Sequence, residues 1–425
     1  MNSSRLAILF LLLLTVGCAG LSSPGGTPPP EVYVTPSPAT PAAEAATATP
    51  SGPISLRIWL PPEFDPSAGT TAGEILQRRL DEFASRRPGT HIEVRIKEPD
   101  GPGGLLDSLT TANAAAPLAL PDLVALPRSA LETAALKGLV HPFTGLSDQI
   151  DTPEWFEYAQ QLARLQNSTF GIPFAGDAMI LVYRPSVLSL LPEDLTSALR
   201  LEGPLAFPAA DPQALFTLAL YQAAGGGIRD EQGRPILQAD ILEQVLELYQ
   251  DGSEAEYTPF WLTQLQTDEQ AWGEFTEKNA PLVVTWISRY LSTDQADMAA
   301  APLLTLAGND FTISNGWVWA LGSPDPERQE LATELAEFLS EADFLSEWTS
   351  ETGYLPPRAS SLENWRDAGL QPLALRVAQS AQLMPAGDLL ASLAPVLQGA
   401  TIDVLKKQTD PQSAARNAAD SLAVP

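Results

Sequence analysis

The sequence predicts an α/β fold with a mostly parallel sheet and helices on both of its faces. Residues 54–138 alternate strand and helix patterns in the order β-α-β-α-β-α, which is typical of such a sheet. The chain has 425 residues, 44% of them hydrophobic, which is enough apolar surface for a large core. After about residue 181 the pattern becomes mostly helical, which indicates a second part of the fold.

The first predicted strand, Ile54–Leu60, is a short apolar run that two prolines close. Residues 72–87 follow with one apolar face and predict an amphipathic helix, and residues 91–97 alternate as a strand does. The same part of the chain continues with a helix over 104–115, a strand over 122–126 and a helix over 129–137. Ligands of parallel α/β sheets bind at the carboxyl ends of the strands.

The rest of the globular part is predicted from shorter patterns. Its elements are helices over 211–224, 240–249 and from Asp325, a hairpin over 227–237, strands over 281–287 and 316–321, and further helix over 362–423. We expect Asp325 to cap the helix that it precedes. Beyond the N-terminus we expect no segment with the length of a membrane span.

Residues 1–18 read as a bacterial lipoprotein signal peptide. Arg5 precedes an apolar core of eleven residues, Leu6–Val16, which is shorter than the ~20 residues of a membrane-spanning helix. Residues 15–18 resemble a lipobox, although Thr15 stands where leucine is usual. We therefore predict cleavage before Cys18 and lipidation of its thiol. The alternative is an ordinary signal peptide that contains a cysteine.

Residues 19–52 predict a disordered stalk. They contain eight prolines among Ala, Thr, Ser and Gly, with two acids and no basic residue. Such a composition cannot bury enough apolar surface to fold, and it favours extended polyproline-II chain. At ~3.1 Å per residue the stalk could span on the order of 100 Å.

Charge and residue counts exclude several classes of function. Acids outnumber Lys and Arg by 52 to 24, a net charge of −28, which disfavours nucleic-acid binding. One cysteine permits no intrachain disulfide, and two histidines disfavour histidine-based metal sites and Ser-His or Cys-His catalysis. We therefore predict no metal and no cofactor.

Five stretches in order resemble the extracellular solute-binding proteins of ABC importers, the carbohydrate-type group called family 1, in lipoprotein form. They are ISLRIWL with LDEFASRRPGTHIEVRI, PDLVALPRSALETAALKGLVHPF, FGIPFAGDAMILVYRPSVL, GGGIRDEQGRPILQADILEQVLELY and NGWVWALGSPDPERQELATELAEFLSEADFLSEWTSETGYLPPR. The resemblance implies a periplasmic-binding-protein-like fold, with two α/β lobes joined by a hinge of several crossings. Lobe 1 would comprise 53–176 plus 312–345, and lobe 2 would comprise 177–311 plus 346–425.

Aromatic residues are the first candidates for a sugar site, because aromatic rings stack on the apolar faces of sugars. The candidates are Trp59, which ends the first strand, Trp286, Trp317, Trp319 and Tyr354. Trp317 and Trp319 alternate with Val318 and so share one strand face. For Trp286 and Tyr354 the resemblance adds that relatives carry a cleft aromatic there. The alternative for each is core packing.

Polar candidates would bind the hydroxyls of a sugar. Asp177 lies at the first predicted hinge crossing, and Asn315 precedes the tryptophan strand. Arg128 and Ser129 follow the strand over 122–126, where a helix begins and offers free N–H groups. Each could instead be a turn residue or a paired surface group.

The sequence and the resemblance together predict a membrane-tethered, extracytoplasmic solute-binding lipoprotein. It would capture a sugar or oligosaccharide between the lobes and deliver it to an ABC permease, as a monomer and without catalysis. Three alternatives remain open: the same fold binding a polyamine-like cation, a lipoprotein that presents its ligand to a sensor, and a glycoside hydrolase that uses two carboxylates.

Overall fold

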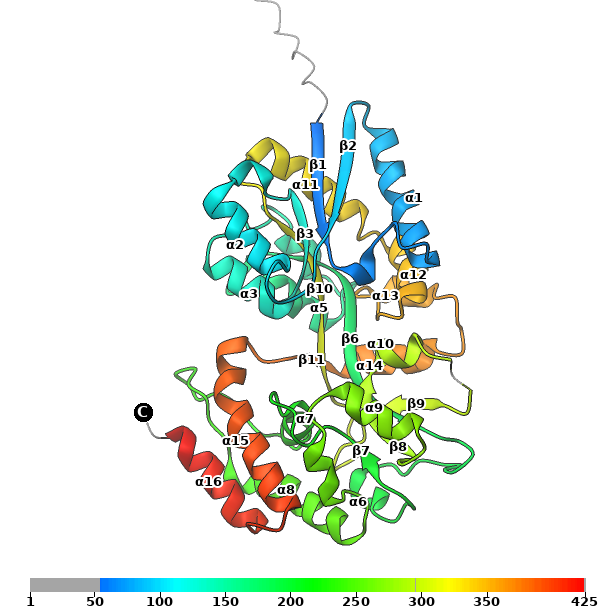
Figure 1. Cartoon of the computed structure of the whole chain (residues 1–425), viewed down its shortest axis with the longest axis vertical. Coiled ribbons are helices and arrows are strands. Elements are labelled where there is room, and N and C mark those ends of the chain that lie inside the picture. The colour runs from blue at the N-terminus through cyan, green and yellow to red at the C-terminus, as the bar shows by residue number, and fades with distance from the viewer. Residues whose placement is uncertain (1–53, 295, 424–425) are drawn as a thin grey trace, which may run out of the picture. The chain divides into compact units, whose positions relative to one another are not determined.

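A computed structural model describes residues 54–294 and 296–423 of the chain (Figure 1). The predicted signal peptide, Cys18 and the stalk lie outside these described residues.

The first part of the sheet is parallel, as the sequence predicts. Strand β1 (Ile54–Leu60) lies between β2 (Thr90–Ile96) and β3 (Leu123–Pro127) and runs parallel to both. Helices α1 (Thr71–Arg86) and α2 (Leu105–Ala115) connect these strands. The predicted β-α-β-α-β order is confirmed, and α3 (Arg128–Leu136) continues it.

Two long strands extend the sheet and connect its two parts. The first half of β6 (Ile172–Tyr183) pairs with β10 (Thr312–Leu321), and its second half pairs with β8 (Leu282–Trp286) and β9 (Ala299–Pro302). Strand β10 pairs in turn with β3 and with β11 (Ala381–Leu383). Figure 1 shows β6 and β10 running side by side between the two groups of elements.

The prediction of a mostly parallel sheet is wrong in this second part. The main order is β2-β1-β3-β10-β6-β8-β7, and β10 is antiparallel to both β3 and β6. Strand β6 is also antiparallel to β8 and β9, whereas β7 (Leu205–Ala206) is parallel to β8. The physical reason is that β10 brings the chain back along β6, so the two crossing strands must run in opposite directions. A separate hairpin joins β4 (Arg164–Leu165) and β5 (Ser168–Thr169).

The remaining helices cover the sheet and form the C-terminal part of the described chain. The α-helices are α4 (Ser147–Ile150), α5 (Glu157–Ala163), α6 (Leu195–Ala198), α7 (Leu215–Ala223), α8 (Ala239–Glu254), α9 (Asp268–Thr276), α10 (Ile287–Leu291), α11 (Pro326–Phe338), α12 (Ala342–Thr352), α13 (Ala359–Glu363), α14 (Gln371–Ser380), α15 (Gly387–Leu405) and α16 (Pro411–Ala423). Short 3₁₀ turns are η1 (Pro62–Phe64), η2 (Pro117–Ala119) and η3 (Phe260–Gln264). Asp325 accepts a hydrogen bond from Glu327 N–H at 3.1 Å, which confirms its predicted cap.

Helix α15 corrects the expectation that no segment beyond the N-terminus has the length of a membrane span. Its 19 residues, with a mean hydropathy of 1.3, would suffice by length and composition. Half of it is buried within the fold, where it packs against α7, α8 and α16. Its apolar character is therefore explained by core packing.

The fold thus has two groups of α/β elements joined by crossing strands. The residue bounds predicted for the two lobes remain a prediction. Helix α12, which those bounds divide at residue 345, packs against α1 of the first group.

Candidate ligand-binding site

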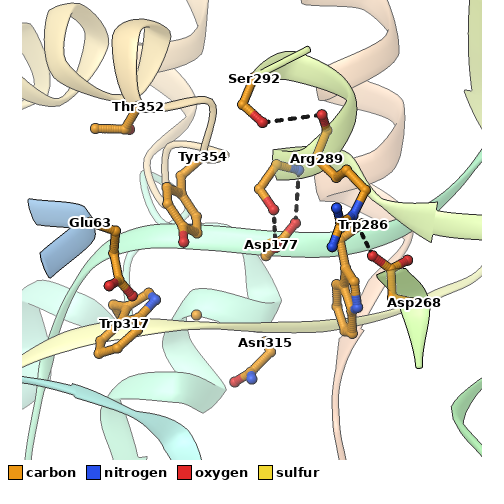
Figure 2. Close-up of a pocket in the computed structure, with 12 residues that line it drawn as sticks. Glu63, Asp177, Asp268, Trp286, Arg289, Ser292, Asn315, Trp317, Thr352 and Tyr354 are labelled. Carbon is orange, nitrogen blue, oxygen red and sulfur yellow. Dashed lines mark hydrogen bonds and ion pairs between the residues drawn. The ribbon is translucent and has the colours of Figure 1, made fainter. Parts of the chain in front are cut away.

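A pocket of about 440 Å³ lies at the paired strands β6 and β10, where both pass between the two groups of elements. Its lining comes from widely separated parts of the chain, namely η1, β6, α9, the end of β8, α10, β10 and the segment at the end of α12. Figure 2 shows these side chains converging from the two crossing strands and the elements around them.

Asp177 lies at the centre of this arrangement, on β6, directly opposite Asn315 on β10. Its Oδ1 accepts hydrogen bonds from the backbone N–H of Ala178 at 3.0 Å and of Ser288 at 3.1 Å. Its Oδ2 accepts from the Ser288 hydroxyl at 2.5 Å. The carboxylate therefore links the crossing strand to α10.

Burial raises the pKa of Asp177 to about 7, against the opposing effect of the Ser288 hydrogen bonds. The negative charge of Asp268 adds to the rise. Near neutral pH this carboxyl is thus close to half protonated, so it can both accept and donate a hydrogen bond.

Arg289 is the cation of the pocket, and it is already paired. Its Nε donates to Asp268 Oδ2 at 2.5 Å, and both side chains keep partial exposure. Asp268 is the first residue of α9, where a carboxylate is favoured by the helix dipole. Among the described residues, no group of three or more His, Cys, Asp or Glu is placed to hold a metal ion.

Aromatic rings form another side of the pocket. Phe64, on η1 just after β1, is 3% exposed and contacts Trp317 and Tyr354 edge-on, with ring centroids 5.3 and 5.5 Å apart. It therefore holds both pocket rings in place. The third ring, Trp286, ends β8 and is half-buried in the pocket lining.

Tyr354 reaches the pocket because the chain turns sharply at the end of α12. Gly353 adopts the left-handed conformation there, with φ of 78°. Leu355 then exchanges two backbone hydrogen bonds of 2.7 Å with Gly176, which places Tyr354 beside Asp177. A Cβ on Gly176 would lie 2.2 Å from the Tyr158 hydroxyl, so only glycine permits this packing.

The charges of two acids in the pocket act on the Tyr354 hydroxyl. Burial raises the pKa of the Tyr354 hydroxyl above its usual range, and the negative charges of Asp177 and Glu63 raise it further, while a hydrogen bond with Trp317 opposes the shift. Asp177 and Glu63 therefore both act on this hydroxyl.

The pocket brings together five of the nine residues that the sequence analysis proposed as ligand contacts. These are Asp177, Trp286, Asn315, Trp317 and Tyr354. We predict that these five side chains contact the ligand.

Two predicted tryptophans are placed in the core. Trp59 is 2% exposed, and its ring is covered by the Lys97 ammonium, 4.8 Å from the ring centroid. Trp319 is also 2% exposed and stacks on Phe174 with centroids 4.2 Å apart. Phe174 covers Trp319, so of these two tryptophans on β10 only Trp317 lines the pocket. We therefore do not carry Trp59 or Trp319 into the site.

Arg128 and Ser129 also lie outside the pocket lining. The Arg128 guanidinium pairs with Glu132 at 2.7 Å and donates to the backbone carbonyls of Gln161, Leu162 and Arg164. Its hydrogen bonds thus fix the end of α5 and leave little to offer a ligand. Ser129 is exposed elsewhere on the surface.

The remaining lining residues were not predicted as ligand contacts from the sequence. They are Glu63, Asp268, Ser288, Arg289, Ser292, Gly316 and Thr352. Ser288 and Arg289 follow a strand that ends in a candidate aromatic, so the rule that ligands bind at strand ends could have found them. Glu63, Asp268 and Thr352 reach the pocket only through long-range packing, for which the sequence carries no local pattern.

Comparisons with known proteins agree with this architecture. The model of the family described as bacterial extracellular solute-binding protein matches residues 79–372, more than half of the chain. No curated protein matches the chain.

Three solved structures illustrate the similarity. Maltose-bound MalE3 of T. maritima has 19% identity and a TM-score of 0.65, over 87% of this chain and 99% of that one. The sugar-binding protein MalE of Xanthomonas citri has 16% identity and a TM-score of 0.68, over 87% and 96%. The cyclic α-maltosyl-1,6-maltose binding protein of Arthrobacter globiformis has 14% identity and a TM-score of 0.68, over 87% and 98%.

At these identities the structural likeness establishes the fold, which is the two-lobed periplasmic-binding-protein fold that the resemblance implied. The family match covers both groups of elements and the pocket residues Asp177, Trp286 and Trp317. This chain belongs to the bacterial extracellular solute-binding protein family.

Proposed function

We propose that this protein captures a mono- or oligosaccharide in the pocket at the β6–β10 crossing. The observation that carries the proposal is the convergence of three aromatic rings, Trp286, Trp317 and Tyr354, with hydrogen-bonding side chains in one pocket. The pocket volume of about 440 Å³ lies within the range of small-molecule sites.

This combination suits the chemistry of a sugar. The apolar C–H faces of the rings stack on aromatic side chains, whereas the hydroxyls need directed polar partners. Asp177 and Asn315 supply such partners from neighbouring positions on the two crossing strands. Trp317 and Tyr354 are also held by Phe64 before any ligand arrives, which lowers the entropic cost of binding.

The ligands of the similar structures support a carbohydrate ligand for this chain. One holds maltose, one is a sugar-binding protein, and one binds a cyclic maltosyl-maltose. Their identities of 14–19% leave the identity of the sugar open for this chain.

We propose further that the protein acts outside the cell membrane as a monomer, tethered by a lipid on Cys18 and by the stalk over 19–52. Ligand binding would shift the two lobes towards a closed form, and an ABC permease would recognise that form. The ligand would be released unchanged, with no bond broken.

The test is ligand binding by the full-length protein, measured by thermal shift and calorimetry against a panel of mono- and oligosaccharides, polyamines and amino acids. A ligand at 100 times its Kd should stabilise the protein by about 2.7 kcal/mol. We expect Trp286→Ala to weaken sugar binding at least about ten-fold, about 1.4 kcal/mol, with a small change in unfolding.

Trp261→Ala is the matched control, because Trp261 is half-buried on η3 and lies outside the pocket. It should bind sugar as the wild type does. Binding of no sugar, or equal affinity in Trp286→Ala and wild type, would contradict the proposed site. Turnover of a chromogenic glycoside would instead show that the protein is an enzyme.

A further inference from the structure

The charges that line the pocket do not balance. Three carboxylates, Glu63, Asp177 and Asp268, face one guanidinium, Arg289. Arg289 pairs with Asp268 at 2.5 Å, so these two charges offset each other. Within the described part of the chain, no Lys or Arg forms an ion pair with Glu63 or Asp177. Because Asp177 is only partly ionised near neutral pH, these two acids together leave between one and two negative charges without a cation.

These two acids lie around one position. The charges of Asp177 and Glu63 both act on the Tyr354 hydroxyl, and the charge of Asp268 acts on Asp177. Figure 2 shows Tyr354 between Glu63 and Asp177. Glu98 and Asp100 add further negative charge next to Glu63. The electrostatic potential inside the pocket is therefore negative.

The pocket lining also contains a buried hydrogen-bond acceptor without a partner. Asn315 Oδ1 is buried and has no hydrogen-bond partner among the described residues, although a buried acceptor normally has one. The Ser288 hydroxyl and N–H are used on Asp177, and the Arg289 Nε is used on Asp268. A ligand that brings N–H donors would meet the carboxyl groups of Glu63 and Asp177, which line the same pocket.

The aromatic rings favour the same kind of ligand. A cation within about 6 Å of a ring centroid is attracted by the negative face of the ring, and the attraction grows when the site excludes water. Trp286, Trp317 and Tyr354 line the same pocket as the acids, so an ammonium group here would meet rings and carboxylates together. A neutral hydroxyl gains neither attraction to the same degree.

We infer that the ligand of this pocket is a saccharide that carries a protonated amine, held by Glu63 and Asp177 among the three aromatic rings. The inference rests on the proposed carbohydrate function and narrows its ligand class. The aromatic rings would take the sugar faces, and the ammonium would complete the charge balance.

The test compares ligand pairs that differ only by an ammonium in place of a hydroxyl. The probes are glucosamine against glucose, galactosamine against galactose, and the β-1,4-linked glucosamine disaccharide against cellobiose, titrated into the full-length protein at pH 7, where Asp177 is partly ionised. We expect the amine of at least one pair to bind about ten-fold more tightly, and the advantage to shrink with added salt as the charges are screened.

A second measurement separates a charge effect from simple size selection. An ammonium beside Asp177 favours its ionised form, so binding of the amino sugar should release protons, and calorimetry in buffers of different ionisation enthalpy detects them. The neutral partner of the pair should release none.

Variants complete the test. Glu63→Gln should reduce the affinity ratio of amine to hydroxyl several-fold, whereas Glu256→Gln, an exposed acid away from the pocket, should leave the ratio unchanged. If neutral sugars bind as tightly as their amines, the amine inference is overturned and the carbohydrate proposal survives. If spermidine binds and every sugar fails, or if no probe binds, both are overturned.

Discussion

Two sides of the pocket are held in different ways. The aromatic wall, defined as Phe64, Trp317 and Tyr354, is held by ring contacts at 5.3–5.5 Å. The polar wall, defined as Asp177, Ser288, Asp268 and Arg289, is held by charged hydrogen bonds of 2.5–3.1 Å. Packing contacts barely respond to pH or salt, whereas ionisable side chains respond to pH and partly exposed ion pairs also respond to salt. The free energy of unfolding should therefore depend mainly on the aromatic wall. Its variation with pH and salt should depend mainly on the polar wall.

The largest effect should come from the aromatic wall. Phe64→Ala removes a fully packed ring that supports Trp317 and Tyr354, so the free energy of unfolding should fall by about 3–5 kcal/mol in urea denaturation. Sugar binding should weaken as well, because the two pocket rings lose their support. Phe64→Leu, which keeps most of the volume, should recover most of both losses. If Phe64→Ala were as stable as the wild type, the stability of the aromatic wall would not depend on the packing of this ring.

The contribution of the polar wall to the free energy of unfolding should depend on pH. The pKa of Asp177 rises from 3.8 to about 7 on folding, so the folded state holds a proton that the unfolded state releases. The stabilising contribution is complete below about pH 4, declines as pH rises, and is lost above about pH 7. Among the titratable neighbours, the charge of Asp268 raises the pKa of Asp177, whereas Tyr158 and Tyr354 stay neutral in this range and have their own pKa raised by the Asp177 charge.

Asp177→Asn has no proton to lose at this position. The stability of the wild type relative to Asp177→Asn should therefore fall by about 1–3 kcal/mol between pH 4 and pH 7, a value reduced to allow for the partial exposure of the carboxyl. Urea unfolding of both proteins across this range measures it. A difference that does not vary with pH would contradict the burial of this charge.

The smallest effect should come from the Asp268–Arg289 pair. Both side chains are partly exposed, so a double-mutant cycle with Asp268→Asn and Arg289→Gln should give a coupling of only about 0.5–1 kcal/mol, decreasing with salt. A coupling of several kcal/mol would mean that this wall is as important for stability as the aromatic one.

Local patterns in the sequence predicted the elements well. The bounds of β1 agree with the prediction at both ends, because an apolar run closed by proline is a local pattern. The antiparallel course of β10 could not be predicted, because its partners β3 and β6 lie far away in the sequence.

The sequence predicted pocket residues where a suitable residue type coincided with a strand end, a predicted hinge crossing or a position that the family resemblance singles out. Trp286 ends a strand and Asp177 lies on the crossing strand, and both line the pocket. Periodicity placed Trp317 and Trp319 on one face but could not show that Phe174 covers the second. The Arg128 side chain binds carbonyls of residues 33–36 positions away, and Glu63 enters the pocket from η1, so both depend on tertiary structure.

The paired hydrogen bonds between Gly176 and Leu355 have a mechanical consequence. They join the chain immediately before Asp177 to the chain immediately after Tyr354. These two side chains should therefore keep a constant spacing while the strands on either side of them bend. A solute that contacts both side chains must fit this constant spacing. Solutes would therefore be selected by size at this point, before any larger movement of the protein begins.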